Sequence, residues 1–181
     1  MRKHWFPKPY ADFVMRMRVP SGFLLAICFG LLAAPTRESL LAGLAIAIPG
    51  LALRAWAAGH LKKNQNLASG GPYAWTRNPL YLGTLLTALG LAAAARSWVV
   101  LAVTASVFAL VYLPVIEQEE QHLLKLFAGY RSYADRVPLL WPRLSRDRSQ
   151  EAFEAAVYWK NEEWKAALAY CAGMGYLLWK L

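Results

Sequence analysis

Three charged residues stand at the ends of two long apolar segments and offer the chemistry of a binding site: Arg77, Glu119 and Glu120. An arginine guanidinium holds a carboxylate through two parallel hydrogen bonds, whereas a glutamate accepts hydrogen bonds from an ammonium group or from hydroxyls. Tyr73 and Tyr81 flank Arg77 in the sequence, and a tyrosine ring can stack on a planar group or face a cation. Residues of these types can therefore bind groups of either charge and planar rings.

Two helices must bring these residues together, because the arginine and the acids are far apart in the sequence. The apolar segments at 80–95 and 98–116 are joined by a polar pair, Arg96 and Ser97. At about 1.5 Å per residue each leg spans roughly 25–30 Å, which is close to the thickness of a membrane's hydrocarbon layer. The segments therefore predict a tight membrane hairpin that places Arg77 beside Glu119 and Glu120 on one face.

The second leg is expected to continue as a helix beyond the membrane, with Glu120 on its apolar side. The residues of this side recur at spacings of three and four: Leu113, Ile116, Glu120, Leu123 and Phe127. A carboxylate on a packed apolar face is costly unless it is paired, so Arg77 is the predicted partner of Glu120. Glu117 lies off this motif, and its replacement is expected to have little effect.

Several ordered motifs fall between residues 70 and 142. They are Gly71-Pro72-Tyr73, Arg77-Asn78-Pro79-Leu80-Tyr81, Glu119-Glu120 followed by Leu123 and Phe127, and the tail Tyr130, Tyr133 and Val137-Pro138. This stretch resembles the isoprenylcysteine carboxyl methyltransferase and phospholipid methyltransferase family of integral membrane enzymes. The resemblance implies an enzyme that transfers a methyl group from S-adenosylmethionine to a lipophilic acceptor, such as an isoprenylcysteine-type carboxylate, a thiol or a lipid.

The resemblance also implies the site residues. The expected cofactor-binding residues are Gly71, Pro72, Tyr73, Arg77, Asn78, Pro79, Tyr81, Glu119 and Glu120. The expected catalytic residues are Arg77, Asn78 and Glu120, and no metal is expected. The tail that contains Tyr130 and Tyr133 is expected to help close the cofactor pocket.

Asn78 departs from the family pattern, which usually has histidine at this position. An asparagine amide donates and accepts hydrogen bonds but does not take up a proton. A carboxylate acceptor is already nucleophilic, whereas an ammonium acceptor must first lose a proton. Asn78 therefore favours carboxylate or thiolate acceptors, although Glu120 stays open as a base.

Composition indicates a single membrane domain over residues 1–181. Apolar residues make up 57% of the chain, the mean hydropathy is +0.27 and the net charge is +9. The domain is divided into an amphipathic N-terminal segment with two spans (1–69), the hairpin core (70–142) and C-terminal helices (143–181). The basic excess points to lipid headgroups and not to nucleic acid, because no nucleic-acid-binding motif accompanies it. The expected partners are the bilayer and a lipophilic or lipidated substrate, and the oligomeric state is open.

The predicted fold is all-α, with four or five transmembrane helices. Spans are expected at 19–34 and 39–58 and in the two hairpin legs, with a polar loop at 59–78. Gly43, Ala47 and Gly50 offer small residues for close helix packing, and Pro49 predicts a kink. After the hairpin we expect a linker at 145–150, a surface helix at 150–160 and a helix capped by Asn161. The apolar run 164–181 is either a fifth span or an interfacial helix.

The distribution of basic residues predicts the orientation. All but two of the 20 Lys and Arg residues lie before the first span, around the 59–78 loop or after the fourth span, and the exceptions are Arg37 and Arg96. The positive-inside rule therefore places the N-terminus and the cofactor site in the cytoplasm. We expect an integral protein of a bacterial or archaeal cell membrane.

Two other functions are compatible with the sequence. Membrane sterol reductases look similar in the hairpin, so an NADPH-dependent reductase is one alternative, and a non-enzymatic membrane scaffold is another. The sequence has no glycine-rich fingerprint of a Rossmann sheet, the fold that binds S-adenosylmethionine in soluble methyltransferases. Binding of one cofactor or the other distinguishes the two enzyme functions.

Overall fold

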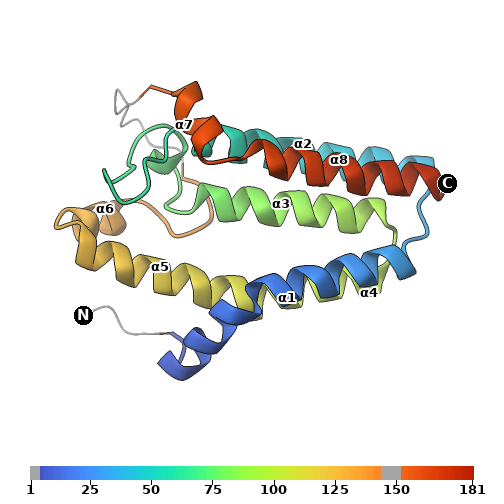
Figure 1. The fold of residues 1–181 in the computed structure, drawn as a ribbon, viewed down its shortest axis with the longest axis horizontal. Coiled ribbons are helices and arrows are strands. Elements are labelled where there is room, and N and C mark those ends of the chain that lie inside the picture. The colour runs from blue at the N-terminus through green and yellow to red at the C-terminus, as the bar shows by residue number, and fades with distance from the viewer. Residues whose placement is uncertain (1–4, 144–151) are drawn as a thin grey trace.

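The computed structural model describes residues 5–143 and 152–181, apart from the side chain of Arg18, and every regular element in them is helical (Figure 1). The helices are α1 (Lys8–Leu32), α2 (Arg37–Ala58), α3 (Pro79–Ala94), α4 (Trp98–Val107), α5 (Leu113–Leu126), α6 (Tyr130–Arg136), α7 (Ala155–Lys160) and α8 (Trp164–Trp179). A 3-10 turn, η1 (Gly71–Ala74), precedes α3, and a π-helical turn, η2 (Phe108–Tyr112), joins α4 to α5. The predicted all-α class is confirmed.

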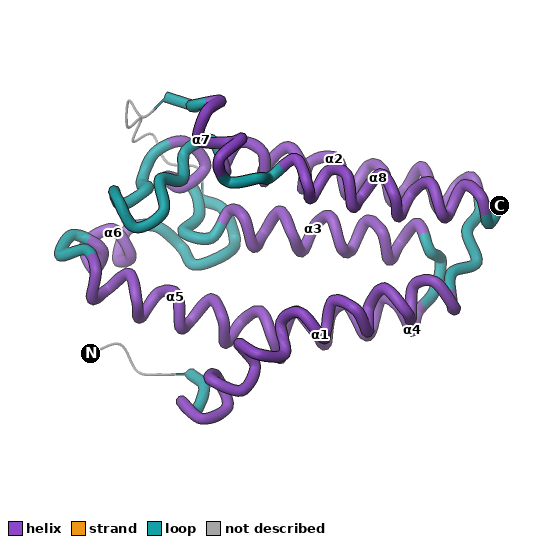
Figure 2. The backbone as a smooth tube through the Cα atoms, viewed as in Figure 1, coloured by secondary structure: helices purple, strands orange, loops and turns teal. Residues whose placement is uncertain are grey.

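The helices form two groups that lie side by side. Figure 1 shows α2, α3 and α8 running together, while α1 runs beside α4. Most loops gather at one end, where the 59–78 loop and α6 lie (Figure 2). At the opposite end the turn after α1 meets the turn after α3, because the Ala34 N–H donates to the Ala95 carbonyl at 2.9 Å. The hairpin legs are less tightly paired than predicted, since α3 packs mainly on α2.

Two of the described helices are long and apolar enough to cross a membrane, which indicates an integral membrane protein. They are α2 and the continuous helix Trp98–Leu126 formed by α4, η2 and α5. The bent helix α1 can be counted as a third. The expected total of four or five spans stays a prediction, because it requires α3 and α8, which have 16 residues each.

The first predicted span is part of a longer, bent helix. α1 begins at Lys8, eleven residues before the predicted start of the span, and its two parts, Lys8–Met17 and Val19–Leu32, meet at 54°. Pro20 lies inside this helix, next to the start of its second part. A proline there removes a backbone hydrogen bond and clashes with the preceding turn, which accounts for the bend.

Glycines let the backbones of α2 and α3 touch. A Cβ atom added to Gly43 would lie 2.5 Å from the Gly90 carbonyl oxygen, and one added to Gly90 would lie 2.6 Å from the Ala47 Cβ. A Cβ on Gly50 would lie 2.8 Å from the Gly83 carbonyl oxygen. The close packing predicted for the small residues of α2 is therefore confirmed, and α2 continues as one helix past Pro49.

The long second leg of the hairpin contains a local irregularity at η2, just before Pro114. Pro114 has no N–H to donate to the Leu110 carbonyl, and π-helical turns often occur where the regular hydrogen-bond ladder is interrupted. The Leu110 carbonyl instead accepts a hydrogen bond from the Tyr10 hydroxyl of α1 at 2.6 Å. The predicted continuation of this helix beyond the apolar run is confirmed, since α5 ends at Leu126.

The C-terminal region differs from the prediction in two places. The expected linker at 145–150 lies outside the described residues. The surface helix predicted at 150–160 is shorter, because α7 begins at Ala155 and Glu154 has extended backbone angles. Asn161 does not cap α8: its side-chain amide donates to the carbonyls of Ala58 and Leu61, at 2.8 and 2.9 Å, and so fixes this turn to the end of α2.

Helix α8 lies along α2 and α3 (Figure 1). Its buried residues Tyr170, Met174 and Leu177 join a core cluster with Leu40, Ala47 and Ala92. Helix α8 thus packs on both α2 and α3 and has 16 residues, as α3 does.

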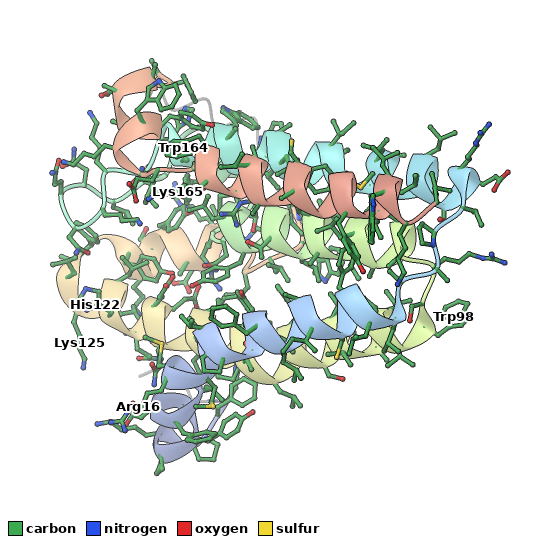
Figure 3. All side chains as sticks on the ribbon, turned by 45° about the vertical axis from the view of Figure 1, so that its right-hand side comes forward. Arg16, Trp98, His122, Lys125, Trp164 and Lys165 are labelled. Carbon is green, nitrogen blue, oxygen red and sulfur yellow. The ribbon has the colours of Figure 1, made fainter. Side chains whose placement is uncertain are left out.

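Two of the basic residues counted after the fourth span, Lys125 and Lys165, lie at the loop end, away from Trp98 (Figure 3). Lys180 is an exception among the residues counted after the fourth span, because its Nζ lies 3.2 Å from the Gly30 carbonyl oxygen at the opposite end.

Cysteine labelling tests the orientation. In a variant without Cys28 and Cys171, we expect Glu38→Cys and Trp98→Cys to react with an impermeant maleimide on intact cells, because the positive-inside rule puts them outside. Gln65→Cys, on the loop of the opposite end, should react only after permeabilisation. Labelling of Gln65→Cys on intact cells would reverse the orientation.

Candidate functional site

Arg77 lies between η1 and α3, and its guanidinium connects three parts of the chain. Its Nη1 donates to the Ala134 carbonyl of α6 at 2.8 Å, and its backbone N–H donates to the Pro138 carbonyl at 2.9 Å. Its Nε lies 2.9 Å from Glu120 Oε1, an ion pair without the angle of a hydrogen bond. The predicted pairing of Arg77 with Glu120 is confirmed.

The ion pair is almost completely buried. The side chains of Arg77 and Glu120 are 5% and 10% exposed, and the Tyr130 hydroxyl donates to Glu120 Oε1 at 2.9 Å. Burial and the neighbouring Glu120 charge both raise the pKa of Tyr130, so this phenol stays protonated and continues to donate. Removing either charge would leave its partner buried and uncompensated.

Glu119, the acid next to Glu120, is exposed and makes a different contact. Its Oε1 accepts a hydrogen bond from the Tyr81 hydroxyl at 2.7 Å. Tyr81 is itself buried against Val115 and Ile116 of α5. Tyr81 therefore orients Glu119 in this structure and does not present its ring as a stacking surface.

A hollow of about 310 Å³, which we call the site pocket, lies between the 59–78 loop, α5 and α6. Three of the predicted site residues line it: Tyr73, Arg77 and Glu119. Its other lining residues are Leu61, Lys63, Asn64, Asn66, Leu67, Ala68, His122, Leu123, Phe127, Tyr130 and Tyr133. Figure 3 shows His122 on α5 at this end of the bundle. The lining of the pocket thus includes two cations, Lys63 and Arg77, and the carboxylate of Glu119, together with several aromatic rings.

Tyr73 carries a buried hydroxyl without a hydrogen-bond partner among the described residues. Its side chain lines the site pocket, and its carbonyl accepts a hydrogen bond from the Tyr133 hydroxyl at 2.7 Å. Burial raises the pKa of Tyr73, so its hydroxyl remains a donor at neutral pH. A buried donor without an acceptor is unfavourable, and a ligand with an oxygen or nitrogen acceptor would satisfy it.

The remaining predicted residues do not line the site pocket. Asn78 uses its side-chain amide to donate to the Leu139 carbonyl at 3.1 Å, and Pro79 is the first residue of α3. Gly71 has φ +55°, and a Cβ there would lie 2.6 Å from the His60 ring, so both conformation and space require glycine. Pro72 is buried in η1. These four residues shape the turn that carries Tyr73 and Arg77.

Sequence reasoning missed the role of Glu117. This carboxylate is buried, and its two oxygens accept hydrogen bonds from the backbone N–H groups of Trp5 and Phe6 at 2.5 and 3.0 Å. Glu117 therefore anchors the N-terminal segment one turn before Glu120. A buried acceptor of two amides is a structural residue, so the expectation that Glu117 can be replaced with little effect is wrong.

Sequence reasoning also missed most of the pocket lining in the 59–78 loop. Nothing in the spacing of Lys63, Asn64 and Asn66 indicates that they face α5. The basic and amide character of this loop was visible in the sequence, but its fold over the site was not.

Comparison with known proteins agrees with the predicted family. The phospholipid methyltransferase family model matches residues 42–129, from within α2 to the end of α5 and the turn after it. This range includes Arg77, Glu119 and Glu120, and it extends the resemblance to α2. The resemblance to this family that the sequence predicted is confirmed.

Two curated proteins are similar to this chain. The cobalt-zinc-cadmium resistance protein CzcN of Cupriavidus metallidurans is 41% identical over 106 residues, 58% of this chain and 49% of that protein. The nickel-cobalt-cadmium resistance protein NccN of Alcaligenes xylosoxydans xylosoxydans is 36% identical over 102 residues, 55% of this chain and 48% of that protein. The chain thus spans about half the length of these relatives, whose names describe resistance and not a reaction. No solved structure matches the chain significantly.

Proposed function

We propose that this chain, which matches the phospholipid methyltransferase family over residues 42–129, is a membrane-embedded enzyme that methylates a lipophilic acceptor with S-adenosylmethionine. The observation that carries the proposal is the site pocket. It joins Arg77 and Glu119 from the two ends of the hairpin and contains the unpartnered hydroxyl of Tyr73.

The lining residues fit the donor's functional groups. Arg77 and Lys63 supply cations for its carboxylate, and Glu119 supplies an acceptor for its ammonium group or its ribose hydroxyls. The Tyr73 hydroxyl can donate to an adenine nitrogen. Phe127, beside the tyrosines of α6, gives the pocket a ring that can stack on the base.

The donor supplies a methyl group on a cationic sulfur, and the protein's contribution is to position it. In-line displacement depends on holding the two reactants in alignment, so fixed side chains supply most of the rate. Glu120 and the Ala134 carbonyl fix the Arg77 guanidinium, and Tyr81 fixes Glu119. The lining side chains are therefore held in place before a ligand binds.

The surroundings of Asn78 and Glu120 favour an acceptor that is already anionic. The Asn78 amide is bonded to the Leu139 carbonyl and takes no proton, and Glu120 is held between Arg77 and Tyr130. Neither side chain is placed to act as a base. A carboxylate or thiolate acceptor needs no base.

Calorimetry with the purified protein tests the choice of cofactor. We expect S-adenosylhomocysteine, the product form of the donor, to bind, and NADPH to give no heat of binding. If NADPH binds and S-adenosylhomocysteine does not, the methyltransferase proposal fails and the reductase takes its place. Binding of neither, by a protein that melts cooperatively, would favour the scaffold.

A further inference from the structure

A second hollow lies between α2, α3, η2 and α8, and none of its lining residues lines the site pocket. We call it the α8 groove; its volume is about 370 Å³, within the range of small-molecule sites. Its walls include Leu91 of α3 and Ala169 of α8, while Arg54, Thr84 and Tyr170 provide its polar groups. A groove with apolar walls and a few polar groups on the side of a membrane bundle suits an amphiphile and not a soluble metabolite.

Arg54 supplies the charged end of the α8 groove. Its Nε pairs with Glu163 Oε1 at 2.5 Å. Its Nη1 donates to the Thr84 hydroxyl. Nη2 has no hydrogen bond to any residue that the structure describes, so one donor of the fork is available to a ligand.

Tyr170 supplies a second donor. The side chain is only 6% exposed, yet its hydroxyl has no hydrogen-bond partner in the described part of the chain. Tyr170 lines the same groove as Arg54. A buried hydroxyl with no acceptor in the protein indicates that a ligand supplies the acceptor atom.

We propose that the α8 groove binds a single-chain lipid with an anionic oxygen head. The head's oxygens accept hydrogen bonds from Arg54 and Tyr170, and the chain lies along Leu91 and the exposed Ala169. This lipid site goes beyond the function proposed above and does not depend on it.

Tyr81 connects the lining of the α8 groove to that of the site pocket. Tyr112 lines the groove and packs edge-on against Tyr81, with ring centroids 6.0 Å apart. Tyr81 in turn bonds Glu119, which lines the site pocket. The Tyr112–Tyr81 ring pair therefore lies between the groove lining and Glu119 of the site pocket.

Photocrosslinking in nanodiscs of neutral phosphatidylcholine tests the proposal. The probe is a diazirine-bearing palmitate, the comparator is the alcohol of the same chain, and mass spectrometry maps the labelled residues. We expect palmitate to label α3 and α8 within the groove, and the alcohol to label them about three- to tenfold less, as the loss of a charged hydrogen bond predicts. Equal labelling by the alcohol would overturn the anionic head.

Two variants with a matched control locate the occupant. Tyr170→Phe should lower palmitate labelling several-fold and leave the melting temperature equal or higher, because no partner in the protein loses a hydrogen bond. Ala169→Leu, at an exposed position of the groove, should abolish labelling, whereas Ala45→Leu on the outer face of α2 should not change it. Unchanged labelling in Ala169→Leu, or a lower melting temperature in Tyr170→Phe, would refute the site.

Binding of S-adenosylhomocysteine by the same variants separates the two proposals. We expect it to be unchanged in Tyr170→Phe and Ala169→Leu. If the unmodified protein binds no S-adenosylhomocysteine but palmitate labels the groove as described, the methyltransferase fails and the lipid site stands. If it binds S-adenosylhomocysteine but palmitate does not label the groove, the lipid site fails and the methyltransferase stands.

Discussion

Glu120→Gln is expected to lower the affinity for S-adenosylhomocysteine about 10- to 100-fold while the protein remains folded, a loss that corresponds to the ~1.5–3 kcal/mol of a hydrogen bond to a charged group. The glutamine oxygen can still accept from Tyr130, so the local packing is kept. The charge that fixes the Arg77 guanidinium is lost, and Arg77 lines the site pocket. Calorimetry and detergent melting curves on the same preparation measure both effects.

Two further substitutions extend this test. Arg77→Lys keeps the charge but has no planar fork to reach both Glu120 and the Ala134 carbonyl, so its affinity should fall similarly. Glu120→Ala removes one partner of a buried pair and should cost about 3–5 kcal/mol of unfolding free energy. Near-normal affinity in both Glu120→Gln and Arg77→Lys would exclude this pair from the site.

The control for these variants must be an acid outside the core. Glu162→Gln is suitable, because the Glu162 side chain is 60% exposed and pairs with Lys165 on the surface. Glu117→Gln is not suitable, because Glu117 is buried and bonds the N-terminal segment. A fall in affinity in Glu162→Gln would indicate a nonspecific effect of charge.

Gly90→Ala is expected to destabilise the protein by about 1–3 kcal/mol or more, because the added methyl group has no space. Its Cβ would meet the Ala47 Cβ at 2.6 Å, the Gly43 carbonyl oxygen at 2.6 Å and the Ala47 backbone nitrogen at 2.8 Å. Two of these three atoms are backbone, so relief requires the whole of α2 to move away from α3. Such a shift would also displace Arg77, which lies two residues before α3.

Gly175→Ala is the matched control, since no atom lies within 4 Å of the position where its Cβ would be built. Alanine is the better helix former by roughly 1 kcal/mol, so this variant should be as stable as the original or more stable. Thermal melting in one detergent compares the two variants. Equal melting temperatures would show that the contact between α2 and α3 is looser than the structure describes.

The sequence by itself determined the pairing of Arg77 with Glu120. Two apolar segments of similar length return the chain to one face, and the spacing of apolar residues places Glu120 on the packed side of its helix. Both signals are local, since helix length and periodicity depend on neighbouring residues alone. The small residues of α2 were visible for the same reason, because a glycine's lack of volume is a property of the residue.

Only the tertiary structure decided what surrounds that pair. The Trp5 and Phe6 amides reach Glu117 across more than 100 residues, as Glu163 reaches Arg54. The partners in such contacts are set by how whole helices dock, and no period or motif in either segment encodes the other. The unpartnered hydroxyls of Tyr73 and Tyr170 are of the same kind, because a missing partner becomes visible only when every neighbour has been placed. The sequence therefore specified the helices and the charges at their ends, whereas packing decided which polar groups remain available to a ligand.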